Sequence, residues 1–408
     1  SKDEYLDAII ALKQAGIESY ADIVLNHKMG ADAIQTIPAT KVDWTNHNQE
    51  NYQKETVKVA TKFTFPGRKH KYSDFEWNWT DFDGIDYNNQ TGENAIFKFV
   101  NKKWGEEVDD EYGNYDYLMG ADLDFSNPRV VKECTDWGKW YLNFTKVDGF
   151  RLDAVKHIDA NFYRDWIKEL RNETKKELFA VGEYWSTDVN KLHKYITETN
   201  GNISLFDVPL HYNFYNASRD ENYDMSKILE HTLVKENPCK AVTFVDNHDV
   251  TRIASILTNK NHLPLAYGLL FGMPGIPCIY YGSEWGEEGV KAPDNDYALR
   301  PCFEEPKPNE LTDFIKELIE VRRNSDALCN GSYRNVVITN HQLIFERRTD
   351  NERVLVAINA GDSEFTAGNG ELQGNFTELL ANADEIENVT LNGQLTMPAY
   401  SVQFLKAV

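Results

Sequence analysis

The sequence has few positive charges and no long hydrophobic run. Its 43 Lys and Arg residues stand against 65 Asp and Glu residues, which gives a formal net charge of −22. Negative charge of this size argues against binding to nucleic acid or to an anionic membrane surface. The chain also lacks a run of about 18 apolar residues, the length that a membrane-spanning helix requires. We therefore expect no nucleic-acid partner and no membrane span.

The five cysteines show no metal-ligand spacing, and an odd number of them cannot all pair in disulfides. Cys134 falls on the face of an expected helix and Cys278 falls inside an expected strand. Both positions favour buried, reduced thiols and a cytoplasmic location. The other three are Cys239, Cys302 and Cys329. Secretion stays open as the alternative, because the sequence opens directly on a helix and offers no segment that can be judged as a signal peptide.

Continuous apolar runs followed by helical patterns predict an α/β fold with parallel strands and crossover helices. At 408 residues and 41% hydrophobic content, the chain can bury a large core and form two or three domains. A closed barrel of this kind needs eight strands, so we expect its first two strands to be missing upstream and two sheet edges to be open. The apolar runs cover residues 17–25, 147–152, 178–183, 203–208, 241–246 and 276–281.

Helix signals lie between these runs. Ser1 and Glu4 are spaced as a capping box, and Gly16 is placed to end that first helix. Asn127 is a candidate cap with Pro128 at the first helical position. Further amphipathic patterns predict helices over residues 160–173, 188–199, 226–235 and 310–323.

Two segments depart from this alternation. Residues 28–122 form a long polar, aromatic-rich stretch, and a segment of this length inside a compact unit is usually functional. It predicts an inserted β-rich domain. From residue 331 the hydrophobic period changes to two, which predicts a C-terminal antiparallel β-sandwich over residues 331–408. The remaining residues, 1–27 and 123–330, are predicted to form the barrel.

Three carboxylates follow three of the apolar runs: Asp153, Glu183 and Asp249. Retaining cleavage of a glycosidic bond needs one carboxylate as nucleophile and a second, protonated one as acid. Arg151 precedes Asp153 by two residues on the same strand face and is placed to keep it ionised. Glu183 leaves an apolar strand, where burial favours a raised pKa and the role of proton donor.

Each acid by itself is more often a solvated loop charge or a helix cap, but the motifs around them come in a specific order. They are DIVLNH (22–27), GFRLDAVKH (149–157), GEYW (182–185) and FVDNHD (244–249). Together they resemble the conserved regions of the alpha-amylase family, glycoside hydrolase family 13. The segment before residue 249 looks like the liquefying bacterial alpha-amylases, and the segment after it looks more like relatives that act on maltooligosaccharides and cyclodextrins.

The resemblance implies a role for each matching residue. Asp153 matches the nucleophile, Glu183 the acid/base and Asp249 the transition-state stabiliser. The residues that match sugar-binding positions next to the cleaved bond are Arg151, His27 and His248. Lys156 and Trp185 match residues that line the sugar-binding positions on the leaving-group side in liquefying amylases, although an aromatic residue at a strand end is as often core. Arg300, just past the last apolar run, is placed to hold a sugar two or three units from the cleaved bond, and a surface salt bridge explains it equally well.

The resemblance also implies calcium, which is held by oxygen ligands. Its structural site would use Asn26, Asp116, Asp122 and the main-chain carbonyl of His157. A further metal cluster would use Asp83, Asp122 and Asp124, but Gly105 and Ser126 stand at two positions where that cluster has acids. An acidic loop is the alternative for Asp83 and Asp124.

The fold that the resemblance implies is a TIM-type (β/α)8 barrel without its first two strands, with an inserted β-rich domain B and the C-terminal domain. The expected activity is retaining hydrolysis of α-1,4-glucosidic bonds in starch, glycogen or maltooligosaccharides by a monomer. Two alternatives stay open. The chain could pass the glycosyl group to a sugar acceptor as a 4-α-glucanotransferase, or it could be an inactive, truncated glucan-binding fragment.

Overall fold

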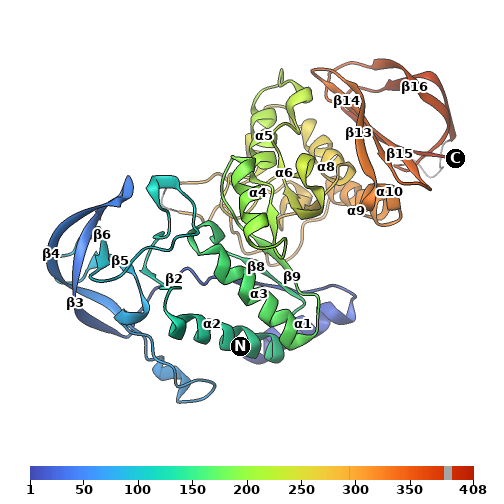
Figure 1. Ribbon diagram of the computed structural model, residues 1–408. Helices are drawn as coiled ribbons and strands as arrows, with labels where there is room; N and C mark the ends of the chain where they lie inside the picture. Colours follow the sequence, from blue (N-terminus) through green and yellow to red (C-terminus); the bar gives the residue numbers. More distant parts are fainter. Residues whose placement is uncertain (294, 381–387) are drawn as a thin grey trace. The chain divides into compact units, whose positions relative to one another are not determined.

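The computed structural model describes residues 1–293, 295–380 and 388–408, and the chain divides into two compact units. Figure 1 labels the helices and strands of both units. The first unit comprises Ser1–Trp185 and Asn190–Leu205, and the second comprises Ser186–Val189 and Phe206–Val408. The division into three domains after residues 27, 122 and 330 stays a prediction.

Parallel strands form where the apolar runs predicted them. In the first unit β1 (Tyr20–Ile23), β8 (Gly149–Leu152), β9 (Phe179–Gly182) and β10 (Ser204–Phe206) are neighbours in that order. In the second unit β11 (Ala241–Phe244) pairs in parallel with β12 (Ile276–Cys278). The six parallel strands expected from the sequence are confirmed. Each is shorter than its apolar run, because the run extends beyond the paired residues at one end or at both.

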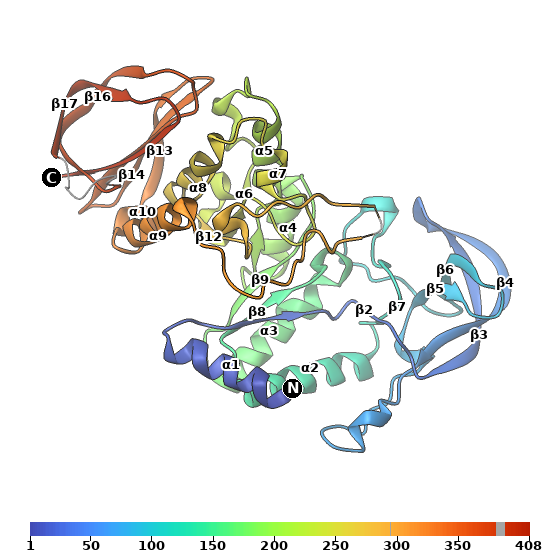
Figure 2. The same ribbon diagram turned by 180° about the vertical axis from the view of Figure 1, so that it is seen from behind.

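The first unit has helices packed against its sheet. Figures 1 and 2 show α2 (Pro128–Thr145) and α3 (Ala160–Thr174) next to β8. The Trp166 indole donates to the carbonyl of Cys134 at 3.1 Å and lies 5.5 Å from the ring of Phe150 in β8. Asn127 caps α2 with Pro128 in its first turn, as predicted. The predicted capping box of Ser1 and Glu4 also forms, at the start of α1 (Lys2–Gln14).

One predicted helix is wrong. Residues 226–235 do not form a continuous helix, because the backbone of His231 takes a positive φ of 54°. A short 3₁₀ turn, Met225–Lys227, comes before this break, and α6 (Leu233–Glu236) comes after it. The remaining helices are α4 (Val189–Glu198), α5 (Val208–Arg219), α7 (Ile253–Ile256), α8 (His262–Gly272), α9 (Glu310–Arg323) and α10 (Asp326–Asn330).

The inserted segment is β-rich, as predicted. A four-stranded antiparallel sheet has the order β4-β3-β6-β5. Its strands are β3 (Ala33–Asp43), β4 (Asn46–Lys62), β5 (Gly84–Asn88) and β6 (Glu93–Phe99). The two ends of the segment meet where β2 (His27–Lys28) pairs with β7 (Ala121–Asp122). This pairing places residues of the inserted segment next to the loop that follows β1.

The C-terminal part of the second unit is antiparallel. Its sheet has the order β13-β14-β15-β18-β16-β17. Asn369 of β16 donates to the carbonyl of Val336 in β13 at 2.7 Å, although other strands separate the two in the sheet, so the sheet bends over on itself around an apolar core. The strands are β13 (Ser332–Ile338), β14 (Gln342–Arg348), β15 (Arg353–Asn359), β16 (Phe365–Glu378), β17 (Asn388–Met397) and β18 (Ser401–Ala407).

All five cysteines are free thiols. Cys134 is buried, as its position in the sequence predicted, whereas Cys278 is only partly buried and the other three are exposed. Among the residues described, no helix combines the length and the apolar character that crossing a membrane would require.

Candidate active site and metal centre

The register of three parallel strands brings two predicted catalytic acids together. Leu152, the last residue of β8, is paired with Ile23 of β1 and with Gly182 of β9. Asp153 and Glu183 follow directly at the same edge of the sheet. The amide of Asp153 donates to the carbonyl of Ile23 at 3.0 Å, and the amide of Glu183 donates to the carbonyl of Leu152 at 2.9 Å.

Arg151 links these acids. Its Nη1 donates to Asp153 at 2.5 Å, and its Nη2 donates to Glu183 at 2.5 Å. Nη1 also reaches Asp22 of β1 at 2.9 Å. Burial by itself lowers the pKa of Arg151, but the charges of Glu183, Asp22 and Asp153 raise it overall. The predicted contact with Asp153 is present, and the guanidinium holds a second predicted catalytic acid as well.

Asp22 is a site residue that the sequence analysis did not single out. It lies in the DIVLNH motif and is directly opposite Arg151 in the β1–β8 register. Side chains that are paired across parallel strands project from the same face of the sheet. The strand register was therefore the signal that would have identified it.

The backbone turns sharply after Asp153. Ala154 has a φ of 51°, a left-handed conformation that is uncommon for a residue with a side chain. The amide of Val155 then donates to the carbonyl of Glu183 at 3.1 Å. Strained backbone of this kind often accompanies functional sites, and here the turn ties the segment after one acid to the main chain of the other.

His27 lies beside the same group. Its Nδ1 is 3.1 Å from the side-chain oxygen of Asn26, and its backbone pairs with Asp122 in the β2–β7 ladder. Burial lowers the pKa of His27, and the charges of Asp153 and Asp86 oppose that shift. A neutral imidazole near Asp153 is able both to donate and to accept a hydrogen bond.

Lys156 is less open than its predicted sugar-binding role suggests. It is 7% exposed. Its Nζ donates to Glu111 at 2.7 Å and to the carbonyl of Trp185 at 3.0 Å, and it lies 4.9 Å from the ring centroid of Tyr115. Trp185 is partly exposed. Lys156 thus joins the loop after β9 to the inserted segment, and sugar binding by these two residues stays a prediction.

The second unit contains the other predicted group. His248 Nε2 lies 3.3 Å from the carboxylate of Asp249. Arg300 Nη2 donates to Asp249 at 2.5 Å, and its Nε donates to the carbonyl of His248 at 3.2 Å. Arg300 also lies 3.4 Å from Asp296. The structure therefore pairs Arg300 with a predicted catalytic acid, and its role toward a distant sugar stays a prediction.

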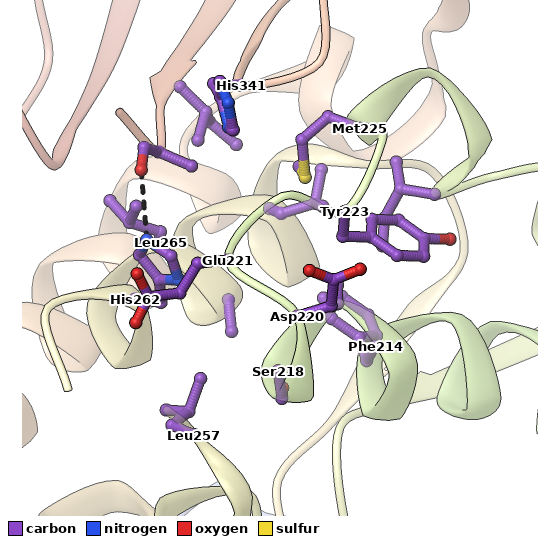
Figure 3. Close-up of a pocket in the computed structure, with 16 residues that line it drawn as sticks. Phe214, Ser218, Asp220, Glu221, Tyr223, Met225, Leu257, His262, Leu265 and His341 are labelled. Atoms are coloured by element: carbon purple, nitrogen blue, oxygen red, sulfur yellow. Dashed lines mark hydrogen bonds between the residues drawn. The ribbon is translucent and has the colours of Figure 1, made fainter. Parts of the chain in front are cut away.

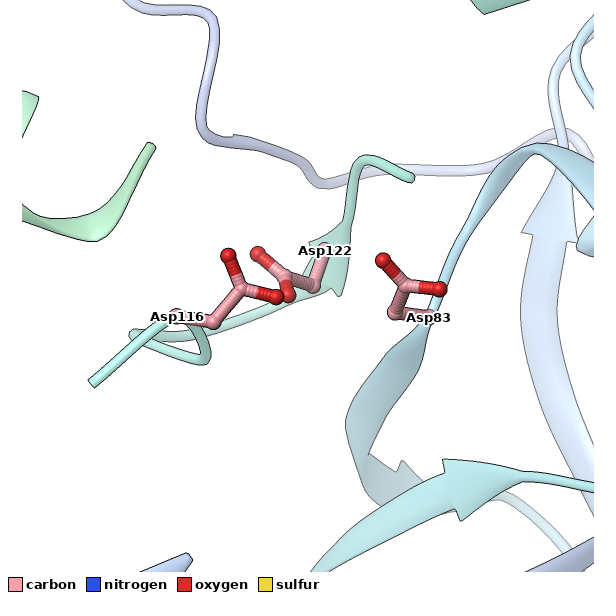
Figure 4. A group of neighbouring side chains, drawn as sticks. All are labelled: Asp83, Asp116 and Asp122. Carbon is pink, nitrogen blue, oxygen red and sulfur yellow. The ribbon is translucent and has the colours of Figure 1, made fainter. Parts of the chain in front are cut away.

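Buried acids at the base of the inserted segment form a candidate metal centre. Ligand oxygens of Asp83, Asp116 and Asp122 all lie within 4.8 Å of one another. Figure 4 shows the three side chains side by side, with Asp122 between the other two. The Asn26 amide lies 3.4 Å from Asp122 and 3.2 Å from the carbonyl of His157. The four ligands predicted for the structural site are thus brought together, and Asp83 joins them.

Protein groups satisfy the carboxylates of this cluster only in part. In the described part of the chain, Asp83 Oδ1 and Asp122 Oδ2 are buried without a hydrogen-bond partner. Burial raises the pKa of Asp116 to about 7. Burial, reinforced by the neighbouring carboxylates, also raises the pKa of Asp83 and Asp122 well above the usual range. Buried carboxylates with unused oxygens are the donor set that a hard cation such as calcium takes.

Asp124, the other acid of the predicted second cluster, has a different partner. Its carboxylate forms an ion pair with Lys102 and accepts from the backbone amide of Ser126 at 2.9 Å. The amide of Gly105 donates to Asp116 at 2.8 Å. A cavity of about 630 Å³ lies beside these groups, with Asp83, Asp116 and Asp124 in its lining.

A smaller cavity lies in the second unit, between α5, α8 and the C-terminal sheet. Figure 3 shows its mostly apolar lining and the hydrogen bond of 3.0 Å from His262 Nε2 to the carbonyl of Ala360. Its volume is about 60 Å³. Small-molecule sites usually have volumes of about 300 to 1,000 Å³, so we assign it no ligand.

Residues 2–324 match the family model for the alpha-amylase catalytic domain. This match covers more than half of the chain, and the acids brought together at the strand ends are those of the motifs described above. The chain belongs to the alpha-amylase family.

Individual relatives agree with this assignment. The alpha-amylase of Geobacillus stearothermophilus is 48% identical over 309 residues, which are 74% of this chain and 56% of that protein. The chain therefore spans little more than half of that relative. The cytoplasmic alpha-amylase of Escherichia coli K12 is 37% identical over 411 residues, 97% of this chain and 81% of that protein.

Solved structures show the same fold. An alpha-amylase from Anoxybacillus superposes with a TM-score of 0.72 at 21% identity, covering 99% of this chain and 78% of that one. The alpha-amylase of Geobacillus thermoleovorans, solved in complex with acarbose, has a TM-score of 0.71 at 20% identity, covering 100% of this chain and 80% of that one.

Proposed function

We propose that this chain hydrolyses α-1,4-glucosidic bonds in starch, glycogen or maltooligosaccharides with retention of configuration. The observation that carries the proposal is the Arg151 guanidinium, which holds the carboxylates of Asp153 and Glu183 at 2.5 Å each. Retaining glycosidases use two carboxyl groups on opposite sides of the scissile bond, one as nucleophile and one as acid. Named alpha-amylases among the relatives support the substrate class.

In the first step the carboxylate of Asp153 attacks the anomeric carbon while Glu183 protonates the glycosidic oxygen. The carbon–oxygen bond breaks, the shortened glucan leaves, and a covalent glycosyl-enzyme remains. In the second step Glu183 takes a proton from water, and the water oxygen attacks the same carbon and releases Asp153. Arg151 orients both carboxylates throughout.

The remaining predicted residues would bind the sugar and stabilise the positive charge that develops on it in the transition state. Asp249, with His248 and Arg300 in contact, would stabilise the oxocarbenium-like transition state, where hydrogen bonds to sugar hydroxyls contribute most. His27 would bind the same sugar from the loop after β1. The roles of Asp249 and His248 rest on their motif and on its match to the family.

We also propose that the acidic cluster holds a calcium ion. Asp83, Asp116, Asp122, Asn26 and the carbonyl of His157 would supply its oxygen ligands. The ion would neutralise the buried carboxylates and hold the inserted segment against the loop after β1.

We further propose a reducing compartment as the location of the protein. Its five free thiols and the cytoplasmic relative support this proposal.

The test is release of reducing ends from soluble starch by the purified chain in calcium, compared with Asp153→Asn and Glu183→Gln. We expect each variant to lose nearly all activity and to keep the circular dichroism spectrum of the parent. Either variant retaining activity near that of the parent would falsify the assigned roles.

Product analysis with added glucose separates hydrolysis from transfer. A hydrolase releases reducing ends in proportion to the bonds cleaved, whereas a glucanotransferase extends the acceptor without a net gain of reducing ends. A folded parent chain without either activity would contradict the proposal and favour a glucan-binding role.

A further inference from the structure

Arg252, three residues after Asp249, is a fully buried charge. It is 0% exposed. Its Nη1 donates to the carbonyl of Tyr281 at 2.9 Å and to the hydroxyl of Ser283 at 3.1 Å, and its Nη2 donates to the carbonyl of Leu299 at 3.1 Å. A charge that is taken out of water needs such acceptors in place of its hydration. The guanidinium therefore joins the segment after β11 to two separate stretches of the chain after β12.

A buried carboxylate supports this contact from the other side. Asp246, the first acid of the FVDNHD motif, accepts from the Ser283 hydroxyl at 2.8 Å and from the amide of Ile253 at 2.9 Å. It is 2% exposed, so it is not open to a sugar. The amide of Arg252 also donates to the carbonyl of Gly289 at 2.9 Å. Arg252 is thus held at its main chain and at its head group, and its planar fork of donors points in a fixed direction.

The carbonyl of Leu299 is held by two donors. Besides Arg252, it accepts from the Tyr280 hydroxyl at 3.0 Å, and the Tyr280 ring centroid lies 4.4 Å from the guanidinium. Leu299 is 0% exposed, whereas the side chain of the next residue, Arg300, is 46% exposed. Arg300 Nη2 in turn donates to the carboxylate of Asp249 at 2.5 Å. A buried, doubly held residue therefore precedes the one that contacts the predicted transition-state stabiliser.

We propose that Arg252 is a positioning residue of the glucan-cleaving reaction: it fixes the main chain at Leu299 so that Arg300 meets the carboxylate of Asp249 in one geometry. The inference rests on the proposed function, in which Asp249 stabilises the transition state. Arg252 has no exposed surface with which to touch a sugar, so it acts through Arg300. The direction in which the Arg300 fork serves Asp249 depends on where its own main chain lies.

The experiment is a double-mutant cycle on the full chain, with steady-state kinetics on soluble starch. We expect Arg252→Lys to lower kcat by about 10-fold and to change KM by less than about twofold, because an interaction made only in the transition state appears in kcat. In an Arg300→Gln background the same substitution should lower kcat by less than about threefold, since residues that act through one another are not additive.

Arg322→Lys is the matched control for stability. Arg322 is also buried, and its guanidinium donates to three carbonyls, those of Phe271, Met273 and Gly275. None of these residues adjoins a predicted site residue. This variant should lose melting temperature much as Arg252→Lys does and should keep the kcat of the parent.

A second variant keeps the test decisive if Arg252→Lys does not fold. Ser283→Ala removes one acceptor of the Arg252 guanidinium and leaves its charge in place. It should lower kcat by about threefold, the size of effect that one modest hydrogen bond has. This loss should disappear in the Arg300→Gln background.

The outcomes separate this inference from the proposed function. A loss of kcat that is equal with and without Arg300 would mean that Arg252 only supports the fold, and it would overturn the inference. An unchanged kcat in the folded Arg252→Lys variant, or in Ser283→Ala where that variant does not fold, would overturn it as well. A folded parent chain that does not hydrolyse starch overturns the proposed function and, with it, this inference.

Discussion

At the residue scale, the site is organised around Arg151. Its guanidinium touches carboxylates on three successive strands: Asp22 on β1, Asp153 after β8 and Glu183 after β9. A planar fork of donors can serve several acceptors in fixed directions, whereas a lysine ammonium acts as a point charge. The shape of this side chain, and not only its charge, therefore sets where the two proposed catalytic acids lie.

We predict that Arg151→Lys lowers kcat on soluble starch by about 100-fold, because a displacement of about 1 Å at the reacting groups has an effect of this size. Steady-state kinetics on the folded variant measure it. Arg164→Lys is the matched control, since Arg164 pairs with the exposed Asp165 on α3, and its kcat should stay near that of the parent. Equal kcat values for the two variants would mean that charge alone positions the acids.

At the scale of elements, α5 and α6 meet at one buried carboxylate. Asp207 accepts hydrogen bonds from the amides of Leu210, Leu233 and Val234 at 3.1, 3.1 and 2.7 Å. Its carboxylate thereby caps the N-terminus of α5 and also accepts hydrogen bonds from two backbone amides in the first turn of α6. Helix α6 begins after the break at His231, which the sequence analysis did not predict. One turn further along α5, His211 Nδ1 lies 2.8 Å from the carbonyl of Val245, and its ring stacks on Phe244 of β11 at 5.1 Å.

We predict that His211 makes the protein less stable in acid. Burial lowers the pKa of His211 from 6.5 to about 4. Between these two pH values His211 binds a proton in the unfolded chain but not in the folded chain. The stability present above pH 6.5 is therefore lost as the pH falls toward 4. The expected loss from about pH 7 to about pH 5 is about 2 kcal/mol.

Urea titrations at these two pH values, on the parent and on His211→Asn, measure this contribution. The variant should be less stable than the parent at neutral pH but should lose less stability on acidification. His70→Asn serves as the control, because the side chain of His70 is 90% exposed. An identical pH dependence in the parent and in His211→Asn would contradict the prediction.

At the scale of the whole molecule, the inserted segment is connected to the parallel sheet through buried acids. Removal of the proposed calcium ion should therefore lower the stability of the whole chain against unfolding. We predict that a chelator lowers the melting temperature, because an ion bound only by the folded chain stabilises it by about 2.7 kcal/mol when free calcium is about 100 times Kd. Differential scanning calorimetry with and without calcium measures the shift.

Magnesium at the same concentration is the control, since its smaller, strictly octahedral shell suits an all-protein cage poorly. It should restore less of the melting temperature than calcium does. A melting curve that thorough chelation leaves unchanged would count against the cation site.

Much of the fold was predictable because its signals are local. An apolar run followed by an amphipathic pattern identifies a strand and its crossover helix within about 30 residues, and all six parallel strands were located in this way. The predicted helix over residues 226–235 failed because its pattern is helical while His231 adopts a left-handed backbone. The caps that compensate this break come from Asp207, which lies outside the segment.

The sequence by itself determined which acids are candidates for the site and in what order they come, because the motifs around Asp153, Glu183 and Asp249 are contiguous and follow apolar runs. Only the tertiary structure decided which charged residues form ion pairs. Examples are Asp22 with Arg151, Glu111 with Lys156, and Lys102 with Asp124. The physical reason is distance along the chain. Ion pairs such as that of Asp22 and Arg151, 129 residues apart, depend on strand register and burial, and no local pattern encodes either.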